Sequence, residues 1–455
     1  MRAKINRRQF IKAAGLGTTF LTMCGSLKAE GFGDGRPERI HPQASLEAAT
    51  LKSSRKPNIV LIMADDIGYE CFGCYGSESY KTPVLDGLAR TGMRFEHCYS
   101  QPLCTPSRVK IMTGQYNFRN YVNFGVLDPK QKTFGHLLRD CGYATCVVGK
   151  WQLYGSVNQS TEIRGTGSLP QQAGFDEHCL WQITDRGPRY KDPVMVQNGK
   201  TLGDLKGKYG PDVSCDYALD FIEQHKAGPF LLYFPMALVH SPFVPTPDSE
   251  DWDKPKHKNN TKYFADMVAY MDKIVGRIVG KLDKLGLRKN TLVLFTGDNG
   301  TARNIRSKIA DRVIRGGKGL TTDGGTHVPL IANQPGVVPA GKFCGDLVDF
   351  SDFVSTFAEA AGTEVPENMK VDGRSFLPQL RGEKRNPREW IFCHYDPRWG
   401  NRGKRRFVRD KRWKLYDNGD LYDVPADKLE QNPNPPGGPA AEARKRLQAV
   451  LDSII

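Results

Sequence analysis

The stretch Lys56-Pro57-Asn58-Ile59-Val60-Leu61-Ile62-Met63-Ala64-Asp65-Asp66 decides the fold of this 455-residue chain. Residues 58–63 form an almost continuous apolar run, which is typical of a strand buried on both faces of a parallel sheet. Asp65 and Asp66 follow at its carboxyl end. Because ligands in open α/β sheets bind just beyond the carboxyl ends of strands, the stretch predicts a polar site at one edge of a sheet.

The same pattern recurs along the chain. Three further apolar runs lead to polar residues: 144–148 before Lys150, 230–234 before His240, and 291–295 before Asp298 and Asn299. Helical patterns lie between the runs, over 82–91, 133–140, 215–224 and 262–285. Strands that alternate with helices predict the α/β class, with a large, mostly parallel sheet sandwiched by helices.

The composition changes near residue 380. Residues 382–387 are typical of a linker, and 390–395, 406–409 and 413–416 of short strands, with a terminal helix over 440–455. We therefore expect a main domain over 56–380 and a small C-terminal α+β subdomain over 385–455 with an antiparallel sheet. Residues 30–55 are rich in Gly, Pro, Ala, Ser and charge, and predict a flexible lead-in.

Residues 1–29 have the pattern of an export signal. Asn6-Arg7-Arg8-Gln9-Phe10-Ile11-Lys12 resembles a twin-arginine motif, a weakly apolar stretch follows, and small residues offer a cleavage site. We expect export through the twin-arginine machinery to the periplasm or cell exterior. An ordinary amphipathic helix is the alternative. No lipid anchor is expected at Cys24, because Met23 before it fits a lipoprotein signal poorly.

The charge of the chain favours an acidic partner. The formal net charge is +15, and residues 1–29 hold six basic and no acidic residues, which leaves 15 − 6 = +9 after cleavage. No recognised binding motif accompanies the charge, so no nucleic-acid partner is expected. No apolar stretch of about eighteen residues occurs, so no transmembrane segment is expected.

The most specific motif is Cys104-Thr105-Pro106-Ser107-Arg108. It resembles the signature of the formylglycine-dependent sulfatases of the alkaline phosphatase superfamily, in which the cysteine is oxidised to an aldehyde after translation. The resemblance implies a maturation enzyme as a partner and hydrolysis of a sulfate ester as the reaction. One hydroxyl of the hydrated aldehyde attacks sulfur, and the other loses its proton so that the covalent sulfate leaves. A serine could manage only the first step.

Asp65, Asp66, Asp298 and Asn299 offer hard oxygen ligands from two strand ends. Such ligands suit Ca²⁺ or Mg²⁺ and not zinc. The resemblance implies that these four residues bind calcium, rather than magnesium, together with the modified Cys104.

The resemblance covers nearly the whole chain after residue 56, and the sulfatase catalytic domain would span 56–380. It implies that Arg108 orients residue 104 and that Lys150 and Lys318 hold the sulfate oxygens. His240 would protonate the departing alcohol, a role that suits imidazole near neutral pH.

Two positions depart from the family pattern. Gln152 stands where a histidine is usual, and it can hydrogen-bond a hydroxyl but cannot accept its proton at neutral pH. His327 stands where an arginine is common, and we treat it as a near-site residue.

Three basic runs favour a sulfated saccharide as substrate, with a small sulfate ester as the alternative. They span 186–191, 301–318 and 398–414. From them and from the departures above we take six candidate substrate-binding residues: Arg186, Arg189, Tyr190, Arg315, His327 and Arg398.

Two other functions stay open. A phosphodiester or phosphonate monoester hydrolase would share the cysteine motif. A calcium-dependent glycan-binding protein without turnover is supported only by Gln152. The joint presence of five residues argues against it: Cys104, Arg108, Lys150, His240 and Lys318.

Overall fold

The computed structural model describes residues 56–400, 402–438 and 440–454. The expected export signal over 1–29 and lead-in over 30–55 lie outside the described residues. The described residues form one compact unit. No helix in the described part of the chain is long and apolar enough to cross a membrane.

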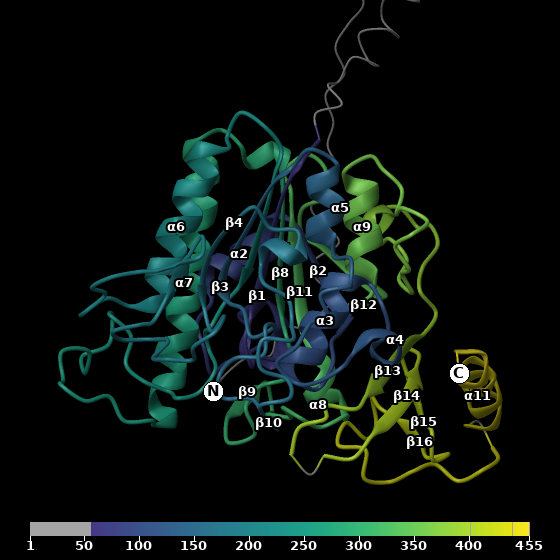
Figure 1. Cartoon of the computed structure of the whole chain (residues 1–455). Helices are drawn as coiled ribbons and strands as arrows, with labels where there is room; N and C mark the ends of the chain where they lie inside the picture. Colours follow the sequence, from purple (N-terminus) through teal and green to yellow (C-terminus); the bar gives the residue numbers. More distant parts are fainter. Residues whose placement is uncertain (1–55, 401, 439, 455) are drawn as a thin grey trace, which may run out of the picture. The chain divides into compact units, whose positions relative to one another are not determined.

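A sheet runs through the centre of this unit (Figure 1). It has ten strands, in the order β12-β2-β11-β8-β1-β7-β3-β4-β5-β6. Its strands are β1 (Asn58–Ala64), β2 (Met93–Tyr99), β3 (Ala144–Lys150), β4 (Glu177–Trp181), β5 (Val196–Gln197), β6 (Lys200–Thr201), β7 (Phe230–Pro235), β8 (Thr291–Gly297), β11 (His327–Asn333) and β12 (Lys342–Asp349). The four adjacent strands β8, β1, β7 and β3 are parallel, whereas β11 runs antiparallel to both of its neighbours. The sheet is therefore mixed and mostly parallel, as predicted.

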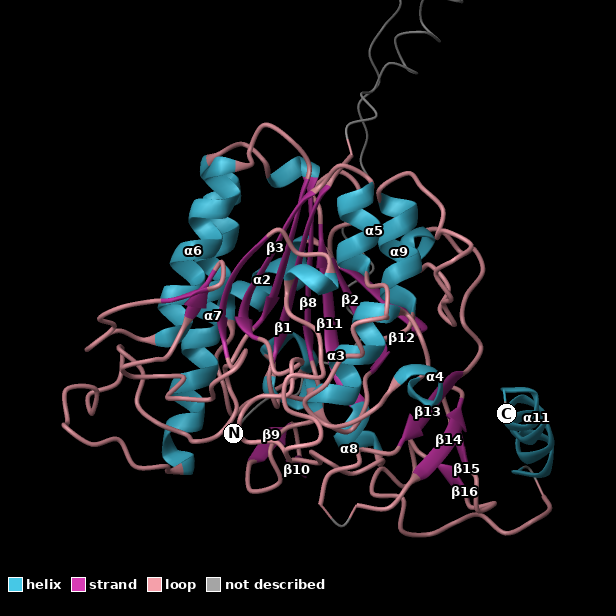
Figure 2. Cartoon of the chain, in the orientation of Figure 1, coloured by secondary structure: helices cyan, strands magenta, loops and turns pink. Residues whose placement is uncertain are grey.

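Helices cover both faces of this sheet (Figure 2). The core around Val60 and Ile62 includes side chains of α2 (Pro83–Thr91), α6 (Gly210–Gln224) and α7 (Phe264–Lys284). The core around Ile59 and Leu61 includes side chains of α3 (Cys104–Thr113), α5 (Phe134–Asp140) and α9 (Asp352–Ala360). Successive side chains of a strand point to opposite faces, so the unbroken apolar run of β1 supplies both cores.

The C-terminal part is a four-stranded antiparallel sheet with a terminal helix. The strands are β13 (Ile391–Tyr395), β14 (Arg405–Arg409), β15 (Trp413–Tyr416) and β16 (Leu421–Asp423), and the helix is α11 (Ala440–Ile454). Leu447 and Leu451 of α11 pack with Val408 and Leu415 of the sheet. Smaller elements are α4 (Asn117–Asn120), the hairpin of β9 (Arg306–Ile309) and β10 (Arg312–Arg315), α8 (Asp323–Thr326) and α10 (Leu377–Leu380).

Candidate active site

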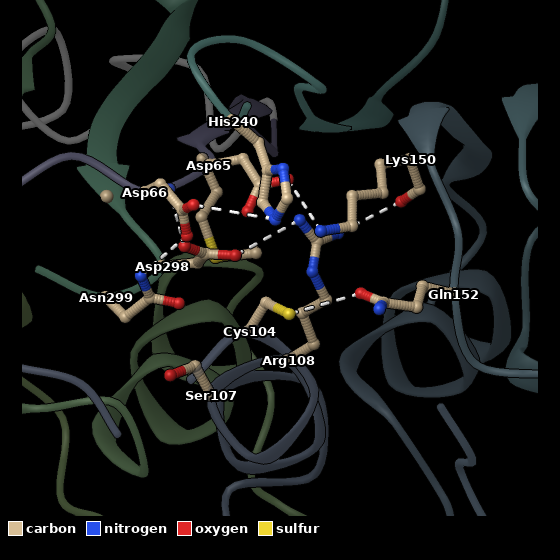
Figure 3. Close-up of polar contacts among 12 residues, drawn as sticks. Asp65, Asp66, Cys104, Ser107, Arg108, Lys150, Gln152, His240, Asp298 and Asn299 are labelled. Carbon is tan, nitrogen blue, oxygen red and sulfur yellow. Dashed lines mark hydrogen bonds and ion pairs between the residues drawn. The ribbon is translucent and has the colours of Figure 1, made fainter. Parts of the chain in front are cut away.

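Four adjacent strands deliver polar side chains to one edge of the central sheet. Asp65 and Asp66 follow β1, Asp298 and Asn299 follow β8, and Lys150 ends β3. The loop after β7 carries His240. These side chains converge in Figure 3, as expected where parallel strands end together.

Helix α3 brings Cys104 and Arg108 to the same place (Figure 3). Cys104 is the first residue of α3, and every residue of this helix is buried. Arg108 lies one turn further on and therefore on the same helix face. Its guanidinium donates to Asp298 Oδ2 at 3.3 Å and to the backbone carbonyl of Lys150 at 3.0 Å. The helix start is thus fixed against the ends of β3 and β8.

The acidic side chains fit a metal ion. Ligand atoms of Asp65, Cys104 and Asp298 lie within 4.8 Å of one another, and all three residues are buried. Asp65 Oδ1 and Asn299 Oδ1 are buried without a hydrogen-bond partner among the described residues. Buried oxygens left without a donor cost free energy, and a hard cation would satisfy both. The donor set therefore suits a cation of the Ca²⁺ or Mg²⁺ type.

Two lysine side chains, one buried and one half-buried, balance these carboxylates. The Lys150 ammonium lies 2.6 Å from Asp65, and that of Lys318 lies 2.5 Å from Asp66. Burial opposes ionisation of Asp65, but the positive charges around it, with Lys150 the largest contributor, together outweigh burial and lower the pKa of Asp65. Burial and the Asp65 charge instead raise the pKa of Asp298 to about 8. A bound cation would favour the ionised form of Asp298.

The Cys104 thiol is a poor nucleophile in its unmodified form. Its side chain is buried, and Sγ donates to Gln152 Oε1 at 3.2 Å. Burial raises the pKa of Cys104. The Lys150 charge lowers this pKa, but the Asp65 and Asp298 charges raise it further, and the net shift is upward. Since the thiolate is the reactive form, an unmodified cysteine here stays protonated and unreactive at neutral pH.

His240 lies beside the carboxylates, with Nε2 3.5 Å from Asp66 Oδ2. Burial lowers the pKa of His240 to about 4, and the Asp66 charge offsets this only in part. The imidazole is therefore neutral at pH 7 before an anion binds. An anion bound next to His240 would raise this pKa toward neutrality.

A cavity of about 180 Å³ opens above Cys104. Its walls include Lys150, Gln152, His240 and Lys318 from the cluster. Three more amide side chains and two tryptophans also line it: Asn158, Gln159, Gln182, Trp181 and Trp399. The cavity is therefore basic and rich in hydrogen-bonding groups directly above the reactive position.

Two of the six predicted substrate-binding residues line this cavity, namely Arg186 and Arg189. Tyr190 is buried beneath them, and its hydroxyl donates to the carbonyls of Ala237 and His240, so it supports the His240 loop. Arg315 and Arg398 are not among the lining residues. The guanidinium of Arg315 donates to the carbonyl of Arg303, and that of Arg398 to the carbonyl of Val122.

His327 does not belong to this site. It lines a separate cavity of about 270 Å³ with Tyr69, His97 and Arg409. Its Nδ1 lies 3.2 Å from Asp323 Oδ2, and its Nε2 lies 2.6 Å from the carbonyl of Glu96. From the resemblance we expected His327 near the active site. It is the first residue of β11, and its side chain lies in this other cavity instead.

Sequence reasoning missed part of the cavity wall. Gln182 follows β4 directly, so the strand-end rule that identified Asp65 applies to it as well. Asn158 and Gln159 come from a loop after β3 and have no pattern that marks them. Phe124 was missed as well, and its ring stacks on Trp399, a residue remote in sequence, with ring centroids 4.7 Å apart.

The model of the sulfatase family matches residues 57–363, about two thirds of the chain. The chain belongs to the sulfatase family. A second model, described as N-sulphoglucosamine sulphohydrolase, C-terminal, matches residues 317–452. The sulfatase is 31% identical to arylsulfatase G of Mus musculus, over 83% of this chain and 79% of that protein. It is 27% identical to N-acetylgalactosamine-6-O-sulfatase of Bacteroides thetaiotaomicron, over 89% of this chain and 94% of that protein. We conclude that this sulfatase is a sulfuric ester hydrolase.

Solved structures share the architecture. The crystal structure of Ps i-CgsB in complex with k-i-k-neocarrahexaose superposes with a TM-score of 0.71 at 26% identity, over 88% of this chain and 92% of that chain. The phosphonate monoester hydrolase of Agrobacterium radiobacter superposes with a TM-score of 0.66 at 20% identity, over 87% of this chain and 95% of that chain, which shows the fold alone. The alkaline-phosphatase-like fold predicted from the sequence is confirmed, and it is common to sulfate and phosphonate ester hydrolases.

Proposed function

We propose that this sulfatase removes sulfate from a carbohydrate, with a formylglycine derived from Cys104 as nucleophile and calcium bound by Asp65, Asp66, Asp298 and Asn299. The observation that carries this proposal is the position of Cys104, which starts a buried helix within reach of Asp65 and Asp298. A hydrated aldehyde there supplies the attacking hydroxyl, and a calcium ion would supply positive charge next to it.

The chain's own residues would hold the substrate and move the proton. Lys150 and Lys318 would bind sulfate oxygens, because both ammonium groups line the cavity next to Cys104. Arg108 would hold residue 104 in place through its contacts with Asp298 and Lys150. His240 would protonate the leaving oxygen once the bound anion has raised its pKa.

The composition of the cavity supports a sugar as the substrate. Amide side chains exchange hydrogen bonds with hydroxyl groups as both donors and acceptors, and Gln152, Gln159 and Gln182 line the wall. The names of two relatives agree, since one matched protein is an N-acetylgalactosamine-6-O-sulfatase and one matched structure holds a neocarrahexaose.

We further propose that the chain is exported through the twin-arginine machinery and that a formylglycine-generating enzyme acts on Cys104 beforehand. Support for export comes from the pattern in residues 1–29. Support for maturation comes from the motif of residues 104–108.

A panel of esters tests the reaction. Matured protein is incubated with sulfated monosaccharides, an aryl sulfate, an aryl phosphodiester and an aryl phosphonate monoester, and kcat/KM is measured for each. We expect the sulfates to be turned over at least about tenfold better than the phosphorus esters. A reversed order would favour the phosphonate monoester hydrolase, and saturable sugar binding without any turnover would favour the binding protein.

Metal removal should lower both activity and stability. Chelation followed by dialysis leaves Asp65, Asp66 and Asp298 buried together, and calcium at about a hundred times its Kd should then stabilise the fold by about 2.7 kcal/mol. Calorimetric melting curves with calcium, magnesium or no metal measure this. In Asp298→Asn we expect calcium to raise the melting temperature by less than it does in the wild type. A melting temperature that calcium does not change in the wild type would contradict the metal site.

Gln152→His should give a folded and active enzyme. The substitution places a proton acceptor beside residue 104, and where breakdown of the covalent sulfate limits turnover it should raise kcat by up to about a hundredfold. The measurement is kcat on an aryl sulfate. Gln182→His is the matched control, because Gln182 lines the same cavity and also has a positive φ, and no gain is expected there. Complete loss of activity in Gln152→His would mean that Gln152 itself binds the substrate.

A further inference from the structure

The cavity above Cys104 carries more positive charge than the sulfatase reaction requires. Its described lining holds four basic residues and no acidic one. Two of them, Lys150 and Lys318, are paired with Asp65 and Asp66 in the cluster below. Arg186 and Arg189 form the rest of this charge, and neither makes an ion pair with a described carboxylate.

Arg189 is held in a fixed position without a counter-ion. Its guanidinium lies over the Trp181 ring at 4.2 Å, and Nη1 lies 3.1 Å from His240 Nδ1. The residue is 7% exposed. Burying a guanidinium costs free energy unless an anion pairs with it, so this arrangement keeps a binding site for an anion ready at the expense of stability.

Arg186 adds a second positive charge beside the first. It is exposed, but it lines the same cavity. Burial and then the charge of Arg189 lower the pKa of Arg186, which shows that the two guanidinium groups repel each other. An oxyanion bound between them would relieve this repulsion and accept charge-assisted hydrogen bonds from both.

This charge lies apart from the place where the reacting sulfate would bind. Asp66 faces Nε2 of His240, at 3.5 Å, whereas Arg189 faces Nδ1 at the other edge of the imidazole. The imidazole ring therefore stands between Arg189 and the carboxylate cluster. An anion bound by Arg189 and Arg186 would therefore be a second anionic group of the substrate, different from the sulfate that reacts.

We propose that Arg186 and Arg189 bind a second oxyanion of the substrate, a sulfate or a carboxylate carried by the same sugar or by the next one. The preferred substrate is then a polyanionic saccharide and not a singly charged one. This inference rests on the proposed carbohydrate sulfatase activity and names the substrate class within it.

Three substrates test the proposal. We compare a hexosamine 6-sulfate, the same sugar with a second sulfate on nitrogen, and a disaccharide in which a uronic acid precedes the hexosamine 6-sulfate. Wild-type enzyme should prefer at least one doubly charged substrate by about tenfold or more in kcat/KM. The second sulfate and the carboxylate are carried by different substrates, so comparing these two substrates also shows which oxyanion the enzyme binds.

Arg186→Gln should reduce this preference to about twofold or less, because the variant keeps a polar side chain without the charge. Arg315→Gln is the matched control: Arg315 belongs to another basic run, is exposed and does not line the cavity. It should keep the wild-type ratio. A wild type that turns over the monosulfate as well as both dianions, or an Arg186→Gln variant with an unchanged ratio, would overturn the proposal while leaving the sulfatase activity intact.

Binding to the Cys104→Ala variant gives a second readout that does not need turnover. Titration calorimetry should show tighter binding of the preferred dianion than of the monosulfate, by about tenfold. The double variant Cys104→Ala, Arg186→Gln should lose this difference. Equal affinities in Cys104→Ala would overturn the second anion site even if none of these sugars is hydrolysed.

Discussion

Cys104→Ala is expected to lower kcat for every sulfate ester by at least about a thousandfold, because it removes the only precursor of the proposed nucleophile. The fold should survive. The thiol makes one hydrogen bond, to Gln152, and alanine is the residue that best favours a helix, so α3 should form as before. Initial rates on an aryl sulfate measure the activity, and urea unfolding measures the stability. Activity within about tenfold of the wild type in matured Cys104→Ala would contradict the mechanism.

Two companion variants sharpen this result. Cys104→Ser should release at most one equivalent of alcohol per enzyme and then stop, because a serine has no second hydroxyl with which to expel the covalent sulfate. Cys393→Ala is the matched control, since Cys393 is also buried and donates to an amide oxygen, Gln101 Oε1 at 3.0 Å. It should keep most of its activity. Continuous turnover by Cys104→Ser would mean that the aldehyde is not required.

Lys110→Met is expected to lower the free energy of unfolding by about 3–5 kcal/mol, the usual cost of breaking a buried ion pair on one side. Lys110 lies on α3, and its ammonium is buried. It donates to Asp349 Oδ2 at 2.7 Å and to the carbonyl of Phe392 at 3.0 Å. The contact ties the active-site helix to the end of β12 and to β13 of the C-terminal sheet. When the Lys110 ammonium is removed, the Asp349 carboxylate stays buried but loses its main partner.

Urea unfolding measures this loss, and two variants control it. Lys273→Met breaks an exposed pair with Asp248 and should change the free energy of unfolding by less than about 1 kcal/mol. In the double variant Lys110→Met, Asp349→Asn, we expect part of the stability to return, because the unpaired charge is gone while Ser351 can still donate to the side chain. If Lys110→Met is no less stable than Lys273→Met, the ion pair does not support α3.

The central strands could be predicted because each carries an uninterrupted apolar run. The runs at 58–63, 144–148, 230–234 and 291–295 became β1, β3, β7 and β8 within a few residues. Several other strands were missed, among them β2 and the edge strand β12. In β2 the apolar run is broken, with Glu96 exposed and Arg94 and His97 half-buried, and β12 begins with Lys342 and Phe343, both exposed. Such strands depend on pairing with distant segments, which no local pattern reveals.

The centre of the site could be predicted because parallel strands end together, so Asp65, Asp66, Asp298 and Lys150 had to meet. The rim could not. His327 begins β11, which is antiparallel to its neighbours, and its side chain goes to another cavity. Arg186 and Arg189 were predicted from a basic run and do line the cavity, whereas Arg315 and Arg398, predicted in the same way, do not. A run of basic residues shows where charge lies along the chain, but not which side chains the folded loops bring to the cavity.

The chemical identity of residue 104 in the mature protein decides the mechanism. Peptide mass spectrometry across residues 104–108, on protein from its native host, measures this directly. We predict a peptide in which an aldehyde replaces the CH₂SH group of Cys104. An unmodified thiol in folded protein that hydrolyses sulfate esters would contradict the account, because it would place the nucleophile elsewhere in the site.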